Sequence, residues 1–449
     1  SKVVHPTVDI TADTTLVLDA RIAAPIAVSF DRPGVRDRVV AAGYGRFTPE
    51  ATLFSGILGD TFDRILIGQV GDPVSREDMI SDISGMWTVP AADGDVTRST
   101  VTYSLAWFDY GRVPIGLTRH IVDSELAEVD TTYRAQQNGK RATKVWVARE
   151  PELNTSVGQG FAFRLPLRRT EFHNVDGLQW SASFEQWSFV KKLVHTEAVQ
   201  NGVPVTHQPG QRYTDSWNSA TFGPGFAGDT DWAARFDDTL FLNIPMYSDS
   251  SPGHYGTSET TSGSTTLYQN GTKIGETNLP GAGQFPVTPA LASYRLETQA
   301  TRSVETSAYS RTISCAWTFT SVHPPDPDPD PKDRDKGKGG HALPLMGVRF
   351  APTLNLTNET TPGPATIPVT VQRPANAPEA TVTSLTVEVS LDDGSTWHPA
   401  PVTRDPDSAS ATVSVDHPTN ARYVSLRARA TDSLGSTAEQ TIIRAYGIR

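Results

Sequence analysis

The chain of 449 residues is long enough for two to four domains, and 37% of its residues are hydrophobic. Its formal net charge of -11 argues against a nucleic-acid partner, because an acidic surface repels phosphate groups. No apolar run is long enough to cross a bilayer as a helix.

Glycine and proline are frequent, with 35 and 33 residues, which suits many short strands joined by turns. The sequence therefore predicts an all-β protein with several β-sandwich domains. We expect a jelly-roll-like large sandwich and a C-terminal immunoglobulin- or fibronectin-like sandwich.

The N-terminal stretch from Ser1 to Pro6 has neither an initiator methionine nor the shape of a signal peptide. We expect a processed product, with any export signal upstream of Ser1. Residues 1–25 are predicted to be the end of a small β-domain, with strands at 8–10 and 14–19.

Residues 26–143 are predicted to form a β-rich domain interrupted by two short helices. Ser75, followed by the carboxylate of Asp78 three residues later, is similar to a capping box, which favours a helix start. A second short helix is expected at 123–129. The expected strands include 26–30, 39–44 and 100–107.

Residues 144–322 are predicted to form a large β-sandwich, similar to a jelly roll. Asn270-Gly271 favours a two-residue type I′ hairpin turn, since both positions need positive φ. Whether residues 26–322 are one domain or two stays open.

The single cysteine, Cys315, alternates with Ile313, Trp317 and Phe319. This period of two predicts a small buried apolar residue on a strand, with a reactive thiol as the alternative. An internal disulfide is excluded.

Residues 323–341 are predicted to be a linker, because alternating proline and aspartate disfavours both helix and sheet and gives an extended spacer. The alternative for the aspartates is calcium binding. Calcium needs six or more oxygens that converge, whereas an extended chain spreads them apart. No cofactor and no metal ligand is assigned.

Residues 342–449 are predicted to form the immunoglobulin- or fibronectin-like domain. Leu385, Val387, Val389 and Leu391 fall on one face of a strand, and the turn 392–394 leads to a second strand bearing Trp397, whose ring can cover a small core.

The same hairpin, residues 390–397, fits the Asp-box of sialidases, S-x-D-x-G-x-T-W. That motif is a structural turn that sialidases repeat on propeller blades. The chain has one copy and a partial echo at 174–180, too few for a propeller. We interpret it as a turn with no catalytic role.

Asp249, His254 and Ser258 are the residue types of a nucleophile, base and orienter, but they lie in one short segment without a G-x-S-x-G elbow. We interpret this segment as a polar surface loop, or a ligand-binding rim, rather than a triad. The histidines are scattered, without zinc-ligand spacing. No catalytic residue is assigned.

Aromatic residues cluster at Trp180, Phe184, Trp187 and Phe189. The alternation of Trp187 and Phe189 indicates core residues. The alternative is an exposed platform for sugar rings.

Seven short stretches together resemble one family. They are DTTLVLDAR at 13–21, DTTY at 130–133, FGPG at 222–225, AWTFTS at 316–321, VRFAP at 348–352, DGSTW at 393–397 and QTIIRAY at 440–446. In this order they resemble the C-terminal, non-catalytic region of large secreted subtilisin-like serine peptidases of actinobacteria.

The family's catalytic motifs, such as H-G-T-H and G-T-S-M-A, do not occur in this chain; Gly256-Thr257-Ser258 is followed by Glu259 instead. The resemblance therefore implies an accessory β-rich region of a secreted endopeptidase that stabilises the enzyme or binds substrate or a surface. Its partner would be the catalytic domain or chain.

The alternative is a free-standing extracellular module that binds carbohydrate or a cell surface. An independent hydrolase is a third hypothesis. The sequence leaves the ligand and the oligomeric state open.

Overall fold

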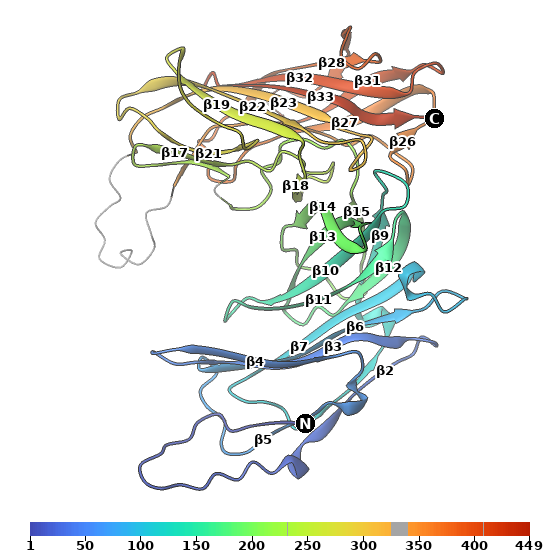
Figure 1. Cartoon of the computed structure of the whole chain (residues 1–449), viewed down its shortest axis with the longest axis vertical. Coiled ribbons are helices and arrows are strands. Elements are labelled where there is room, and N and C mark those ends of the chain that lie inside the picture. Colours follow the sequence, from blue (N-terminus) through green and yellow to red (C-terminus); the bar gives the residue numbers. More distant parts are fainter. Residues whose placement is uncertain (231, 325–339, 407) are drawn as a thin grey trace. The chain divides into compact units, whose positions relative to one another are not determined.

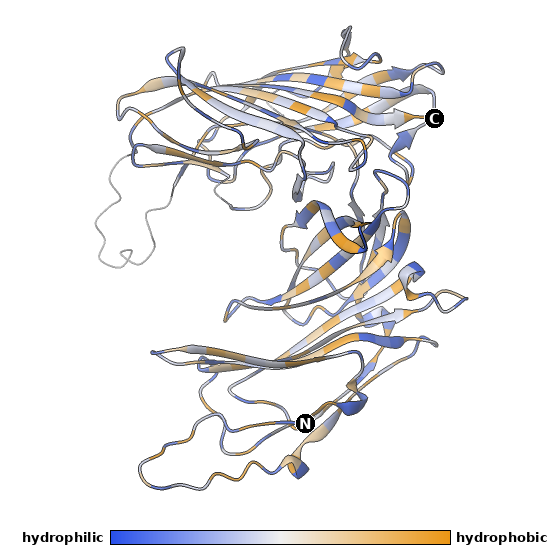
Figure 2. Ribbon diagram, viewed as in Figure 1, coloured by the Kyte–Doolittle hydropathy of each residue, from blue (hydrophilic) through white to orange (hydrophobic). Residues whose placement is uncertain are grey.

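The computed structural model describes residues 1–230, 232–324, 340–406 and 408–449. Apart from four single-turn 3₁₀ helices, its regular elements are strands, which confirms the predicted all-β fold (Figure 1). In Figure 2 the strands carry polar and apolar residues in alternation, the period expected when one face of a sheet is buried. Most of the predicted linker, 325–339, lies outside the described residues.

The chain divides into two compact units. The first comprises residues 1–132, 141–184 and 204–215, and the second comprises 133–140, 185–203 and 216–449. The domain limits predicted from the sequence stay predictions, since this division follows the path of the strands rather than composition.

In the first unit a seven-stranded sheet has the order β15-β9-β12-β7-β6-β3-β4, and a four-stranded sheet has the order β1-β5-β2-β8. The strands are β1 (Lys2–Val4), β2 (Ala24–Phe30), β3 (Arg36–Phe47), β4 (Thr52–Gly59), β5 (Leu66–Gln69), β6 (Met79–Val89), β7 (Val101–Tyr110), β8 (Leu117–Ile121), β9 (Ala127–Tyr133), β10 (Arg141–Glu150), β11 (Thr155–Arg164), β12 (Leu167–His173) and β15 (Arg212–Trp217). The 3₁₀ helices are η1 (Ala20–Ile22), η2 (Phe62–Arg64), η3 (Val96–Arg98) and η4 (Asp123–Glu125). β13 (Gln179–Val190) passes from the first unit to the second after residue 184.

In the second unit the main sheet has the order β20-β19-β22-β23-β33-β32-β28-β29, with β26 also paired to β33. Two four-stranded sheets have the orders β25-β27-β31-β30 and β21-β17-β16-β24. The strands are β14 (Leu193–Gly202), β16 (Ala233–Phe236), β17 (Thr239–Asn243), β18 (His254–Ser258), β19 (Ser262–Gln269), β20 (Thr272–Thr277), β21 (Ala282–Pro286), β22 (Ala292–Thr301), β23 (Thr312–Ser321), β24 (His341–Ala342), β25 (Gly347–Phe350), β26 (Glu359–Thr360), β27 (Gly363–Gln372), β28 (Val382–Ser390), β29 (His398–Ala400), β30 (Val402–Thr403), β31 (Ser410–His417), β32 (Tyr423–Asp432) and β33 (Thr437–Ile448).

One sheet contains strands from before and after the proline–aspartate stretch. β23, which precedes the stretch, pairs with β33 near the C-terminus, from Thr312 opposite Ile443 to Thr318 opposite Thr437. The strands before and after the predicted linker therefore share one ladder of hydrogen bonds.

Three local predictions are wrong. Residues 8–10 and 14–19 form no strand. Among the described N-terminal residues, the pairing with β5 ends with β1, and Ile10 is left 75% exposed. Residues 75–78 form a single turn, closed by the Asp78 N–H donating to the Ser75 carbonyl (3.1 Å), since β6 begins at Met79. The expected helix at 123–129 stops after η4, because β9 begins at Ala127.

The two hairpin predictions are confirmed in their turns. Asn270 (φ 49°) and Gly271 (φ 82°) join β19 to β20. In β28, Leu385, Val387 and Val389 are buried, whereas Leu391 lies beyond the strand end.

Trp397 precedes β29 instead of lying in it, so that prediction is wrong in detail. Its ring lies 4.6 Å from the Arg427 guanidinium carbon. The half-buried indole therefore packs under a cation.

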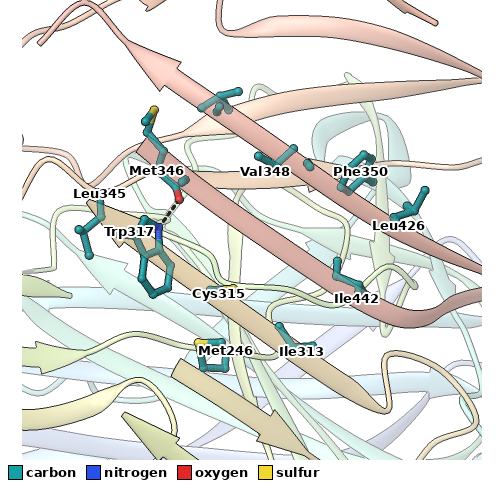
Figure 3. Packing of buried hydrophobic residues seen from close by; sticks show 14 of the residues in the cluster. Met246, Ile313, Cys315, Trp317, Leu345, Met346, Val348, Phe350, Leu426 and Ile442 are labelled. Atoms are coloured by element: carbon teal, nitrogen blue, oxygen red, sulfur yellow. Dashed lines mark hydrogen bonds between the residues drawn. The ribbon is translucent and has the colours of Figure 1, made fainter. Parts of the chain in front are cut away.

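Cys315 lies in the core of the second unit with Ile313, Trp317 and Phe319, as its alternation predicted (Figure 3). Burial raises the pKa of its thiol. The Trp317 Nε1–H donates to the Met346 carbonyl (2.6 Å), which joins β23 to the segment that leads into β25.

Arg349 on β25 is buried and connects several loops of the second unit. Its guanidinium donates to the carbonyls of Gly223 (3.3 Å), Pro224 (3.2 Å) and Ser251 (3.2 Å), and also to those of Ser248 and Asp249. Burial lowers the pKa of Arg349 to about 10, so the group remains a cation at neutral pH.

We expect Arg349→Met to lower the free energy of unfolding by about 3–5 kcal/mol, because buried carbonyls such as those of Pro224 and Asp249 lose a donor. Urea denaturation followed by tryptophan fluorescence measures this. The control Arg429→Met removes an exposed guanidinium and should cost less than about 1 kcal/mol. Equal effects of the two substitutions would contradict the role given to Arg349.

Candidate functional site

The prediction of a polar surface loop at 249–258 is wrong for Asp249 and His254. Asp249 and His254 are both buried, and Asp249 Oδ1 lies 3.1 Å from His254 Nδ1. The His254 ring stacks on Trp217, with centroids 3.9 Å apart. The Asp249 carboxylate also accepts from the backbone N–H groups of Asn218 (2.8 Å) and Ser251 (3.1 Å).

Ser258 does not join this pair. It lies four residues beyond His254 on β18, which separates their backbones by about 13 Å. Its hydroxyl donates to the Glu197 carbonyl (3.2 Å). The three residues therefore form no nucleophile–base–orienter arrangement, and the Asp249–His254 pair serves to fix the loop.

The fold buries three residues of the aromatic cluster and exposes the fourth. Trp180, Phe184 and Trp187 are buried, which confirms the core interpretation for them. Phe189 is 57% exposed at the end of β13, so the core prediction is wrong for this residue.

The first unit contains a cavity of about 540 Å³. Three aromatic residues of β7 line it together with acidic and amide side chains from β10 and the loops after β8 and β12. The lining residues are Ala106, Trp107, Phe108, Tyr110, Arg119, His120, Ile121, Glu125, Leu126, Glu150, Pro151, Glu152, Asn174, Val175, Asp176, Gly177 and Leu178.

One wall of the cavity is held by Tyr110 and the end of β10. Burial, together with a hydrogen bond to Glu150, raises the pKa of Tyr110 to about 12. The Arg76 guanidinium lies 4.2 Å from the Tyr110 ring centroid and forms an ion pair with Glu152. Glu150 accepts the backbone N–H groups of Glu152 (2.9 Å) and Leu153 (2.8 Å), which fixes the turn at this wall.

The other wall is the turn at 174–178, the partial Asp-box echo in the sequence. The Asn174 side chain pairs with the backbone of Ala106, accepting from its N–H (3.0 Å) and donating to its carbonyl (2.6 Å). Trp180 Nε1–H donates to the Asn174 carbonyl (2.7 Å). Gly177 takes the positive φ (76°) that the turn requires. These contacts give the turn a structural role.

A buried charged cluster lies elsewhere in the first unit, and no sequence motif predicts it. Lys144 Nζ lies 2.9 Å from Glu171 Oε2 and 3.6 Å from Asp215 Oδ2. The Thr131 hydroxyl and the Trp146 indole also donate to Glu171, at 2.9 and 3.1 Å. The carboxylate of Glu171 is therefore compensated by several donors, as a buried charge requires.

His173 lies beside this cluster, between the rings of Trp146 (4.2 Å) and Trp180 (4.8 Å). Burial lowers the pKa of His173 to about 3, with Glu171 opposing and His207 and Lys144 adding to the shift. Burial also lowers the pKa of His207, whose ring is parallel to that of His173 at 6.0 Å. Both imidazoles are therefore neutral in the folded protein near neutral pH.

Because the folded-state pKa of His173 is below the ordinary value of 6.5, the unfolded chain binds the proton first. We expect the stability that this residue provides to be complete above pH 6.5 and to fall as the pH drops toward 3. At pH 5 the loss is about 2 kcal/mol. Urea denaturation at several pH values measures it.

His173→Leu should remove this part of the pH dependence, whereas His398→Leu, at an exposed position, should leave it unchanged. An unaltered pH profile in His173→Leu would contradict the assignment.

In the described part of the chain, no three His, Cys, Asp or Glu residues are grouped so that they could hold a metal ion. Among these same residues, no helix has the length and apolar character needed to cross a membrane.

A family model, the F5/8 type C domain, matches residues 368–440, which span from β27 into β33. F5/8 type C domains are β-sandwich modules that are often involved in binding. A comparison with curated protein sequences found no match.

Two solved structures show a distant likeness. The sulfane dehydrogenase SoxCD from Paracoccus pantotrophus is 12% identical over 49% of this chain and 62% of that chain, with a TM-score of 0.19. The eight N-terminal Ig domains of Down Syndrome Cell Adhesion Molecule are 8% identical over 93% of this chain and 67% of that chain, with a TM-score of 0.17.

Proposed function

We propose that this chain is a non-catalytic, extracellular binding region that holds a carbohydrate in the cavity of its first unit. The cavity carries the proposal: at about 540 Å³ it has the size of a small-ligand site. Trp107, Phe108 and Tyr110 line the cavity and supply apolar surface for a sugar. Asp176, Glu125 and Glu152 offer acceptors to hydroxyl groups.

We further propose that the region works beside a subtilisin-like catalytic domain or chain. This proposal is supported by the contacts that the family-like stretches make with one another in the second unit. Arg349 of VRFAP donates to the carbonyls of FGPG, and Gln440 of QTIIRAY pairs with the backbone of Val348 at 3.1 and 2.8 Å. Three of the seven stretches thus contribute to the core of the second unit, which suits an accessory region, whereas the stretch 13–21 is exposed.

The cavity is tested by retention of the purified chain on insoluble polysaccharides, with soluble oligosaccharides as competitors. Tyr110→Ala should weaken binding about fivefold, since one aromatic contact contributes about 1 kcal/mol. The control is Tyr268→Ala, which removes a partly buried tyrosine of the second unit. No retention on any glycan, or equal loss in both variants, would contradict the proposal.

The partnership is tested on native secreted material by gel filtration, intact mass and a serine-hydrolase probe. We expect the chain to elute with, or be covalently part of, a polypeptide that reacts with the probe. Elution alone, with no labelled species, would count against a peptidase partner and leave the binding module.

A further inference from the structure

β4 is the last strand of the seven-stranded sheet, and in the described residues it pairs only with β3. Its sequence, TLFSGILG, has no charged residue and no proline, although edge strands usually carry such residues to prevent pairing. Phe54 and Leu58 are 65% and 72% exposed. This edge therefore presents free backbone donors and acceptors beside two exposed apolar side chains.

The register of the sheet places a slot next to this edge. Gly56 on β4 lies opposite Gly43 on β3, which lies opposite Asp82 on β6 and then Phe108 on β7. On the same face, Phe54 and Leu58 flank Gly56 along β4. Because the two glycines carry no side chain, a groove of about 350 Å³ opens between Phe54 and Leu58 and reaches Asp82, with residues 155–157 also lining it.

Asp82 is the charged group of this groove. A methyl group built on Gly43 would lie 2.8 Å from Asp82 Oδ1, so the glycine leaves the carboxyl group uncovered. The Ser84 hydroxyl is 3.4 Å from Asp82 Oδ2, and none of the ion pairs within the described residues includes Asp82. Burial raises the pKa of Asp82, and the nearby charge of Lys2 opposes that shift.

We propose that an extended polypeptide segment adds as a strand to β4 and places a lysine or arginine side chain in this groove. Only another strand satisfies a row of alternating backbone donors and acceptors. The glycine floor accommodates the aliphatic part of the side chain, and the negative charge of Asp82 attracts its cationic end across the groove. A second copy of β4 would bring no cation, since residues 52–59 contain none.

This site lies outside the binding of carbohydrate proposed above and would let the region hold an unfolded or extended protein chain. The probe is a fluorescein-labelled peptide, Thr-Val-Thr-Lys-Thr-Val-Thr, compared with versions carrying norleucine or glutamate in place of lysine. Fluorescence anisotropy with the full chain measures binding. We expect the lysine peptide to bind about tenfold more tightly than the norleucine peptide, because Asp82 attracts the charge of the lysine.

Two variants test the two parts of the site. Asp82→Asn keeps the shape and should abolish the preference for lysine while leaving norleucine binding intact. Gly56→Leu should fill the groove and weaken all peptides. A side chain fits there, since the nearest atoms to a Cβ are 3.6 and 3.7 Å away. The matched controls are Gly253→Leu and Asp416→Asn in the second unit, which should bind like the native chain.

Equal affinity for lysine and norleucine, or a lysine preference that survives in Asp82→Asn, would overturn the proposal. So would the absence of peptide binding together with a dimer that Gly56→Leu dissociates in sedimentation, since the edge would then belong to a second copy. Urea denaturation checks that Gly56→Leu folds; if it does not, Asp82→Asn decides. Glycan retention should be unchanged in Asp82→Asn, which separates this test from that of the cavity.

Discussion

Much of the second unit depends on the hydrogen bonds that the buried guanidinium of Arg349 donates. A cation removed from water is costly, and five backbone carbonyls compensate it here. Those carbonyls belong to two segments, 223–224 and 248–251, whose backbones pair at Gly223 and Ser248. The same hydrogen bonds therefore offset the desolvation cost of the arginine and fix the loop that contains Asp249 and His254. This explains why a segment rich in reactive residue types is rigid and structural.

The two units use buried polar groups in different ways. In the second unit, Asn358 donates to the carbonyls of Ala135 (3.2 Å) and Asn218 (3.1 Å), so loop backbones are paired inside the core. In the first unit, a charged cluster around Glu171 is closed, whereas the cavity beside Tyr110 and the groove over Gly43 remain open. The cavity beside Tyr110 is the ligand site that we propose.

Packing also explains where three of the stretches that resemble a subtilisin-like peptidase lie. The buried faces of 316–321 and 440–446 lie on neighbouring strands β23 and β33, and 348–352 begins within β25. Residues of this kind are constrained by packing and by paired backbone groups.

The sequence by itself determined the all-β class, the turn at Asn270-Gly271 and the buried face of β28, because these depend on period-two alternation and on local φ preferences. It also placed Cys315 in a core. It did not determine the exposed end of β13 at Phe189, nor the irregular course of residues 5–19, because burial there depends on whether another element covers the segment.

Only the tertiary structure decided the candidate sites. Gly43, Gly56 and Asp82 come from three strands and meet through sheet register, which a single sequence does not encode locally.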